Sequence, residues 1–167
     1  FDIVGPSFLE YDKIHNTNTI VTACIYSDPK LLNKLIDVGG DIHSTNSDGA
    51  SALQLAASGD NVKVLKYLFA LGLRPDHIDT HTHDESECVK GNTPLISATQ
   101  HQAANAVVCL LDSGYECLLD HKNCADQTAF DYITLACCSW QDWPGWFIKK
   151  MKEYFTSNEQ IKRLDKY

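Results

Sequence analysis

Several features that mark common protein classes are missing from this sequence. Its apolar runs fall short of the roughly eighteen residues that cross a bilayer, and its first residues lack the basic start and apolar stretch of a signal peptide. Positive charge is scarce as well, because 14 lysines and arginines against 22 acids give a formal net charge of -8. Such a charge repels nucleic acid phosphates and anionic lipid. We therefore expect a cytoplasmic protein that binds no nucleic acid and inserts into no membrane.

Cysteine pairs and the signatures of common enzymes are also missing. The seven cysteines form no CxxC pair, and their odd number in a chain of 167 residues favours reduced thiols over a disulfide scaffold. No P-loop, GxGxxG, HExxH or GxSxG motif occurs. Cys137 and Cys138 lie in an apolar stretch, where we interpret them as small packing residues rather than nucleophiles. We therefore predict a non-enzymatic chain with no catalytic residue and no cofactor.

The sequence does contain an internal repeat. The stretch from Asp48 to Gly72, DGASALQLAASGDNVKVLKYLFALG, aligns without a gap with the stretch from Lys90 to Gly114, KGNTPLISATQHQAANAVVCLLDSG. A weaker copy comes before them, since Gly39 lies 33 residues ahead of Gly72, and a divergent copy begins at Asp126. Each copy holds a turn, a short helical stretch and a longer one with apolar residues every three or four positions. The repeat therefore predicts a stack of two-helix units.

The unit resembles the ankyrin repeat, in which a glycine precedes a T-P-L-H-x-A motif and a second glycine closes two helices. The motif residues of the best copy are Gly91, Thr93, Pro94, Leu95, Ala98 and the closing Gly114. The resemblance implies an all-α solenoid of stacked helix-turn-helix units with β-turn tips and capping helices. Gln54, Ile96 and Asp131 replace the motif histidine, so we expect weaker hydrogen bonding between repeats.

The resemblance organises the chain as one domain. We assign residues 1–12 to an N-terminal cap, 13–45 to the first repeat, 46–87 to the second, 88–122 to the third, 123–156 to a divergent fourth repeat and cap, and 157–167 to a helical tail. A helix is predicted to begin at or just after Pro144, with Phe147 and Met151 on the side that closes the core. The tryptophans that we assign to the same cap are Trp140, Trp143 and Trp146.

A histidine-rich segment interrupts the regular spacing between the second and third units. Gly49 and Gly91 are 42 residues apart, whereas the preceding units are 33 apart. The inserted residues, 77–87, include the pair His81 and His83, with Cys88 next to the insertion, and these side chains are of the types that hold zinc. A single HxH pair is too common to identify a metal site, and enzymes built on one need a barrel of roughly 250 residues. We interpret His77–Cys88 as a solvated loop and predict no metal.

The resemblance implies a concave face, built from turn tips and first helices, that binds a partner protein or peptide. The register of the repeat leaves the aromatic side chain of Tyr26 exposed there, and such side chains are enriched as binding anchors. Two functions fit: a monomeric interaction module without chemistry, or a substrate-recruiting or regulatory domain of a larger enzyme such as a kinase, an acyltransferase or a pathogen effector. The residues that we predict to contact the partner are Ile25, Tyr26, Asp48, Ser58, Lys90, Asn92, Gln100, His101 and Gln127.

Overall fold

The computed structural model describes residues 19–46, 49–75, 91–136 and 143–154. This part of the chain contains helices and no strand, with one isolated antiparallel bridge between Thr45 and Ser51. The helices are α2 (Thr19–Ala23), α3 (Pro29–Asp37), α4 (Ala52–Ser58), α5 (Val62–Ala70), α6 (Pro94–Gln100), α7 (Ala104–Asp112), the 3-10 helix η1 (Glu116–Asp120), α8 (Ala129–Ala136) and α9 (Gly145–Tyr154).

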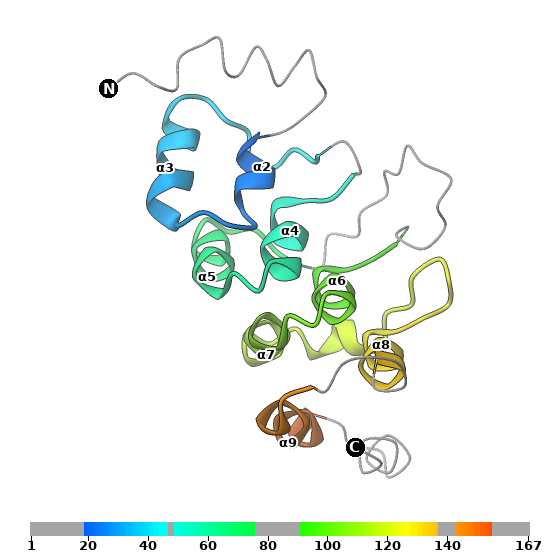
Figure 1. Ribbon diagram of the computed structural model, residues 1–167. Helices are drawn as coiled ribbons and strands as arrows, with labels where there is room; N and C mark the ends of the chain where they lie inside the picture. The colour runs from blue at the N-terminus through cyan, green and yellow to red at the C-terminus, as the bar shows by residue number, and fades with distance from the viewer. Residues whose placement is uncertain (1–18, 47–48, 76–90, 137–142, 155–167) are drawn as a thin grey trace.

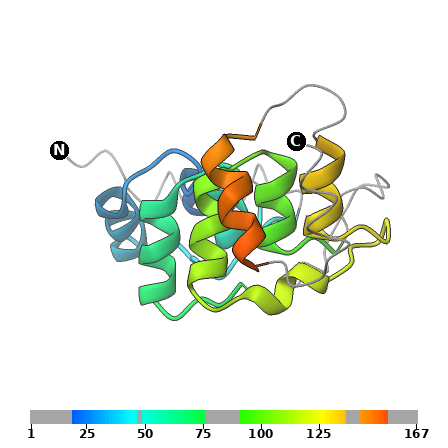
Figure 2. The ribbon, with the colours of Figure 1, turned by 90° about the horizontal axis from the view of Figure 1, so that it is seen from below.

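The α-helices form two layers (Figures 1 and 2). In the inner layer α2 contacts α4, α4 contacts α6 and α6 contacts α8, while in the outer layer α3, α5, α7 and α9 follow one another in the same way. The first three inner helices also pack on the outer helix that follows them in the chain. The chain therefore alternates between the layers and advances by one helix pair per unit, which confirms the predicted solenoid.

Side chains fix where the helices begin. Ser51 accepts a hydrogen bond from the backbone of Gln54, whose side chain accepts one from the Ser51 backbone, so the two form a capping box at the start of α4. Thr93 caps α6 through the backbone N–H of Ile96, and Pro94 follows at the first helical position. Capping side chains therefore determine where the turn of each of these repeats ends and its first helix begins.

Glycines end the outer helices, as predicted. Gly39, Gly72 and Gly114 follow α3, α5 and α7 with φ angles of 95°, 88° and 88°. This left-handed region costs a residue with a Cβ atom about 1 kcal/mol or more, whereas glycine adopts it freely. The closing glycine of each unit is therefore required by backbone conformation.

We expect Gly72→Ala to lower the free energy of unfolding by about 1 kcal/mol. A Cβ atom at Gly72 would meet nothing within 4 Å, so the loss would come from the positive φ alone. Gly145→Ala is the matched control, because Gly145 also has nothing within 4 Å but no positive φ, and this substitution should leave stability unchanged or slightly raised. Urea denaturation of both variants measures the difference, and equal losses would contradict the assignment.

The core lies between the two layers and continues along the stack. Leu53, Leu95 and Leu110, apolar positions of the repeated helices, are 4%, 0% and 0% exposed. Alanines on the inner helices, such as Ala56 and Ala98, are fully buried and allow neighbouring units to approach closely. Each unit covers the apolar surface of the next, as expected of a quasi-one-dimensional fold.

Hydrogen bonds between repeats are retained despite the altered motif. Gln54, which replaces the motif histidine in the second unit, donates from Nε2 to the carbonyl oxygen of Asn92 in the third unit at 2.8 Å. Asp60 accepts from the backbone N–H of Ala106 at 2.7 Å. The expectation of weaker bonding between repeats is wrong at position 54, because glutamine offers a donor where the histidine would.

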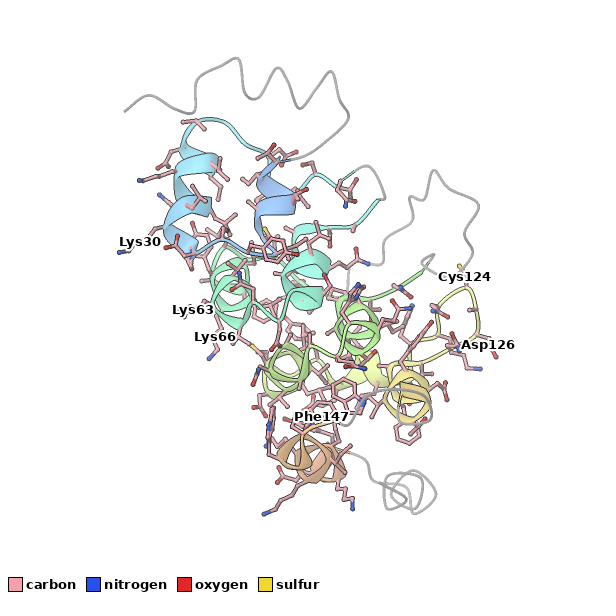
Figure 3. All side chains as sticks on the ribbon, in the orientation of Figure 1. Lys30, Lys63, Lys66, Cys124, Asp126 and Phe147 are labelled. Atoms are coloured by element: carbon pink, nitrogen blue, oxygen red, sulfur yellow. The ribbon has the colours of Figure 1, made fainter. Side chains whose placement is uncertain are left out.

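The last helix closes the carboxyl end of the stack. It begins at Gly145, next to the predicted Pro144, and its side chains Phe147 and Met151 are fully buried. Phe147 lies between α9 and α7 (Figure 3). Trp143 stacks on Phe147 with ring centroids 4.2 Å apart and donates from Nε1 to the carbonyl oxygen of Ile133. Trp143 is therefore part of the cap, as predicted, whereas Trp146 is 48% exposed. Trp140 and the assigned ranges 1–12 and 157–167 lie outside the described residues.

Candidate partner-binding surface

A groove of about 610 Å³ follows the inner helices, and we call it the inner groove. The end of α2, the length of α4 and the end of α6 form its sides, and Asn46 and Ala50 from the tip before α4 lie at one margin. Its lining includes Ile25, Tyr26, Leu55, Ser58, Gln100 and His101.

The turn after α2 determines the position of Tyr26. Backbone bonds from Ile25 to Thr22 and from Tyr26 to Ala23 continue the helical path for one more turn, so neighbouring side chains point in different directions. Cys24 is fully buried, whereas Tyr26, two residues later, is 90% exposed. An aromatic ring this exposed on a folded surface contributes nothing to the core and is available to a partner.

The structure brings five of the predicted contact residues together. Ile25, Tyr26, Ser58, Gln100 and His101 all line the inner groove, although they come from three successive units. Gln127 is half-buried on the tip before α8 and does not line this groove. Asp48, Lys90 and the His77–Cys88 segment lie outside the described residues.

Asn92 is placed differently from the prediction, which put it on an exposed tip. Its side chain is 0% exposed, donating from Nδ2 to Gln100 at 2.9 Å and accepting from Asn123 at 3.0 Å. Polar side chains inside a fold need such partners, and these partners hold Asn92 inward. Asn92 is therefore a structural residue that joins two units and is unavailable to a binding partner.

Gln100 lines the groove and also supports the fold. Its Oε1 atom accepts the hydrogen bond from the buried amide of Asn92, so truncating it would leave a buried donor without that partner. His101, by contrast, is exposed, and its Nδ1 atom contacts only the Ser97 carbonyl within its own helix at 2.9 Å. His101 can therefore be replaced at lower structural cost than Gln100.

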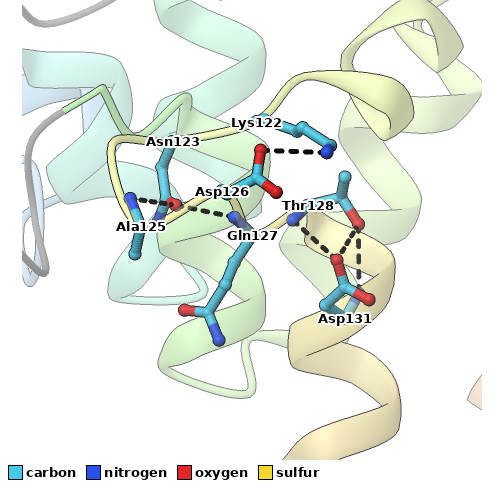
Figure 4. A network of polar contacts seen from close by, with 7 residues as sticks. All are labelled: Lys122, Asn123, Ala125, Asp126, Gln127, Thr128 and Asp131. Atoms are coloured by element: carbon cyan, nitrogen blue, oxygen red, sulfur yellow. Dashed lines mark hydrogen bonds and ion pairs between the residues drawn. The ribbon is translucent and has the colours of Figure 1, made fainter.

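The tip before α8 is held by a network of polar contacts (Figure 4). The Oδ1 atom of Asn123 accepts from the backbone N–H groups of Ala125 and Gln127, both at 3.0 Å. Lys122 and Asp126 form an exposed ion pair. Thr128 caps α8 by accepting from the backbone N–H of Asp131, and the carboxylate of Asp131, which replaces the motif histidine of this unit, accepts from the backbone N–H and the hydroxyl of Thr128. The backbone of this tip is therefore fixed by its own side chains.

Cys24 and Cys109 are not activated nucleophiles. Burial raises the pKa of the Cys24 thiol to about 12, and burial also raises the pKa of Cys109. Since the thiolate is the reactive form, both groups stay protonated and inert at neutral pH. The described part of the chain also contains no cluster of three His, Cys, Asp or Glu side chains that could hold a metal.

Sequence reasoning missed several residues of the groove. Leu55 lies one helical turn before Ser58 on α4, so the three-residue step along the same face was the signal that could have found it. Gln102 has a φ of 56° in the turn after α6 and also lines the groove, but sequence alone gives no sign of this conformation.

The family follows from comparison with known repeats. A family model for ankyrin repeats, in three copies, matches residues 20–123, which is more than half of the chain. The chain belongs to the ankyrin-repeat family. Beyond the match, α8 and α9 continue the ankyrin stack as a further pair, with α8 on α6 and α9 on α7. A search of curated proteins found no match.

Membership in this family carries a general role. Ankyrin repeats are generally protein–protein interaction modules and are typically non-catalytic. Among the described residues, no helix has the length and apolar character needed to cross a bilayer.

Proposed function

We propose that this ankyrin domain binds a partner protein or peptide through the inner groove. The observation that carries the proposal is the 90% exposed ring of Tyr26 at the rim of a groove that runs across three units. Aromatic side chains beside a concavity supply much of the binding energy in protein interfaces. A partner side chain that packs against Tyr26 would gain apolar contact without any rearrangement of the stack.

The chemistry of the groove favours a partner surface with little charge. Ile25, Tyr26 and Leu55 supply apolar surface, and Ser58 and Gln100 supply hydroxyl and amide groups. The one carboxylate, Asp60, already accepts hydrogen bonds from Asn105 and Ala106. An apolar side chain flanked by polar backbone groups suits this lining better than a charged one. The unreactive Cys24 and Cys109 are compatible with a cytoplasmic monomer, which we include in the proposal.

Tyr26→Ala should weaken partner binding by about tenfold or more, because truncation of an anchoring aromatic side chain costs on the order of 2 kcal/mol. The partner is first isolated with the unchanged protein, purified, and titrated against each variant by calorimetry. His101→Ala should weaken the same binding by a smaller factor, since this side chain lies at the other end of the groove.

Leu71→Ala is the control for this measurement. Leu71 is also an exposed apolar side chain, at 44%, but it follows α5 and does not line the inner groove. It should leave affinity and melting temperature nearly unchanged. A partner that binds Tyr26→Ala and His101→Ala as tightly as the unchanged protein would place the binding site elsewhere and overturn the proposal.

A further inference from the structure

A second groove, larger at about 1080 Å³, lies along the outer helices, and we call it the outer groove. It extends from the turn between α2 and α3 across α5 and α7 to α9. Tyr26 and the Gly59–Asp60 turn line both grooves and so form a ridge between them. The outer groove is therefore a separate surface, built from helices that the inner groove does not use.

The outer groove has an apolar floor and an aromatic side chain at each end. Val62 from α5 and Val108 from α7 lie along it, while Tyr26 and Trp146 come from its two ends. Trp146 remains 48% exposed although its ring contacts Phe147 edge to face, with centroids 6.0 Å apart. Trp146 is thus held by the fold and open to solvent, the state in which an aromatic side chain binds a partner with little ordering cost.

The acidic side chains of this groove already have partners. Asp28 accepts from the backbone N–H of Leu31 as the cap of α3, and Asp60 accepts from Asn105 and Ala106 at 2.7 Å each. Asp112 accepts from the hydroxyl of Tyr154 and lies 3.7 Å from Lys150. The helix dipoles at the starts of α3 and α7 offset part of the charge of Asp28 and Asp60, and Lys150 offsets part of that of Asp112.

Unlike the acidic side chains, the lysines of this groove form no pairs within the described residues. Lys63 and Lys66 are exposed, lie one turn apart on α5, and form no hydrogen bond or ion pair within the described residues. Lys30, at the equivalent position of the preceding unit, extends from α3 on the same side of the stack (Figure 3). In a chain of net charge -8 this is a local concentration of unpaired positive charge.

The geometry points to the outer groove as a docking site for an acidic peptide segment that carries an apolar side chain. Carboxylates of the segment lie against Lys63 and Lys66, and its apolar side chain packs over Val62 and Val108 toward Trp146. A continuous phosphate backbone fits poorly, because it offers no apolar side chain to the groove floor of Val62 and Val108. The chain would then hold two partners, one on each side of the Tyr26 ridge.

The probe for this site is a fluorescently labelled peptide of glutamate pairs separated by leucine and phenylalanine. Fluorescence anisotropy at low salt and at about 0.15 M salt reports its binding to the whole chain. Lys63→Glu with Lys66→Glu should weaken binding by about tenfold or more, because two attractive pairs become repulsive. Trp146→Ala should weaken it by a similar factor through lost apolar contact.

Matched variants separate this site from general charge attraction. Lys34→Glu with Lys149→Glu changes the net charge equally, but neither lysine lines the groove, so binding should change less than about threefold. His101→Ala alters the inner groove alone and should leave peptide binding intact. Circular dichroism checks the fold of each variant, and Lys63→Gln with Lys66→Gln replaces the charge reversal if that variant unfolds.

Three outcomes would overturn the proposal. The first is no binding of the acidic peptide to the unchanged protein at low salt. The second is an equal loss in the Lys34 and Lys149 control, which would mean attraction without a site. The third is equal or tighter binding of a peptide with serine in place of the apolar residues, or of single-stranded DNA, since either would show that the groove floor takes no part.

Discussion

Leu95→Ala is expected to lower the free energy of unfolding by about 2 to 5 kcal/mol. Leu95 is 0% exposed on α6, the inner helix that contacts α4 before it, α8 after it and α7 within its own unit. Truncation would remove apolar contacts of this buried side chain and leave a cavity that surrounding helices fill only partly. In a stack whose units are stabilised by nearest neighbours, a central unit has no substitute for the lost contacts.

The Leu95→Ala loss is measured by urea denaturation followed by circular dichroism. Leu71→Ala serves as the comparison, because Leu71 is 44% exposed and its truncation should cost no more than about 0.5 kcal/mol. If Leu95→Ala cost less than about 1 kcal/mol, α6 could not be the tightly packed centre of the stack that the structure describes.

The sequence was sufficient for the features that repeat. The three- and four-residue apolar steps predicted the paired helices, and the spacing of Gly39, Gly72 and Gly114 predicted where the outer helices end, because only glycine adopts positive φ without cost. The register also identified Leu53 and Leu95 as buried. These features depend on local backbone conformation and recur in each unit, so the pattern in one copy supports the prediction for the others.

Features that depend on one contact between distant residues could not be predicted. Asn92 is polar and follows the turn glycine, so by register it belonged on an exposed tip, and only its bonds to Gln100 and Asn123 explain why it is buried. The outer groove joins Tyr26 to Trp146, which are separated by three units of the stack. Nothing in the sequence at either position indicates that the two residues line one groove.

The two grooves share the Tyr26 ridge. A change at Tyr26 alters both surfaces, so loss of a partner in Tyr26→Ala does not by itself identify the groove. His101 belongs to the inner groove only, and Lys63 and Trp146 to the outer groove only. Comparing these three positions assigns each partner to one side of the ridge.

Asn123→Ala should lower the free energy of unfolding by about 2 to 4 kcal/mol. Asn123 is 5% exposed and donates to Asn92 at 3.0 Å and to the hydroxyl of Tyr132 at 3.2 Å, while its Oδ1 atom accepts from two backbone N–H groups of the tip. Removing its amide leaves several of these groups without partners, some of them away from water. An unsatisfied buried polar group costs about 1 to 3 kcal/mol, which is why the expected loss exceeds that of one ordinary hydrogen bond.

The control is Asn33→Ala, since Asn33 also bonds two side chains, Asp37 and Tyr67, but does so on the exposed surface. Water replaces those bonds, so the loss should stay below about 1 kcal/mol. A double-mutant cycle with Asn92→Ala tests whether the two buried amides act together, and their coupling should be about 1 kcal/mol or more. Losses that add within about 0.5 kcal/mol would show that the bond between Asn92 and Asn123 contributes little to the contact between the third and fourth units.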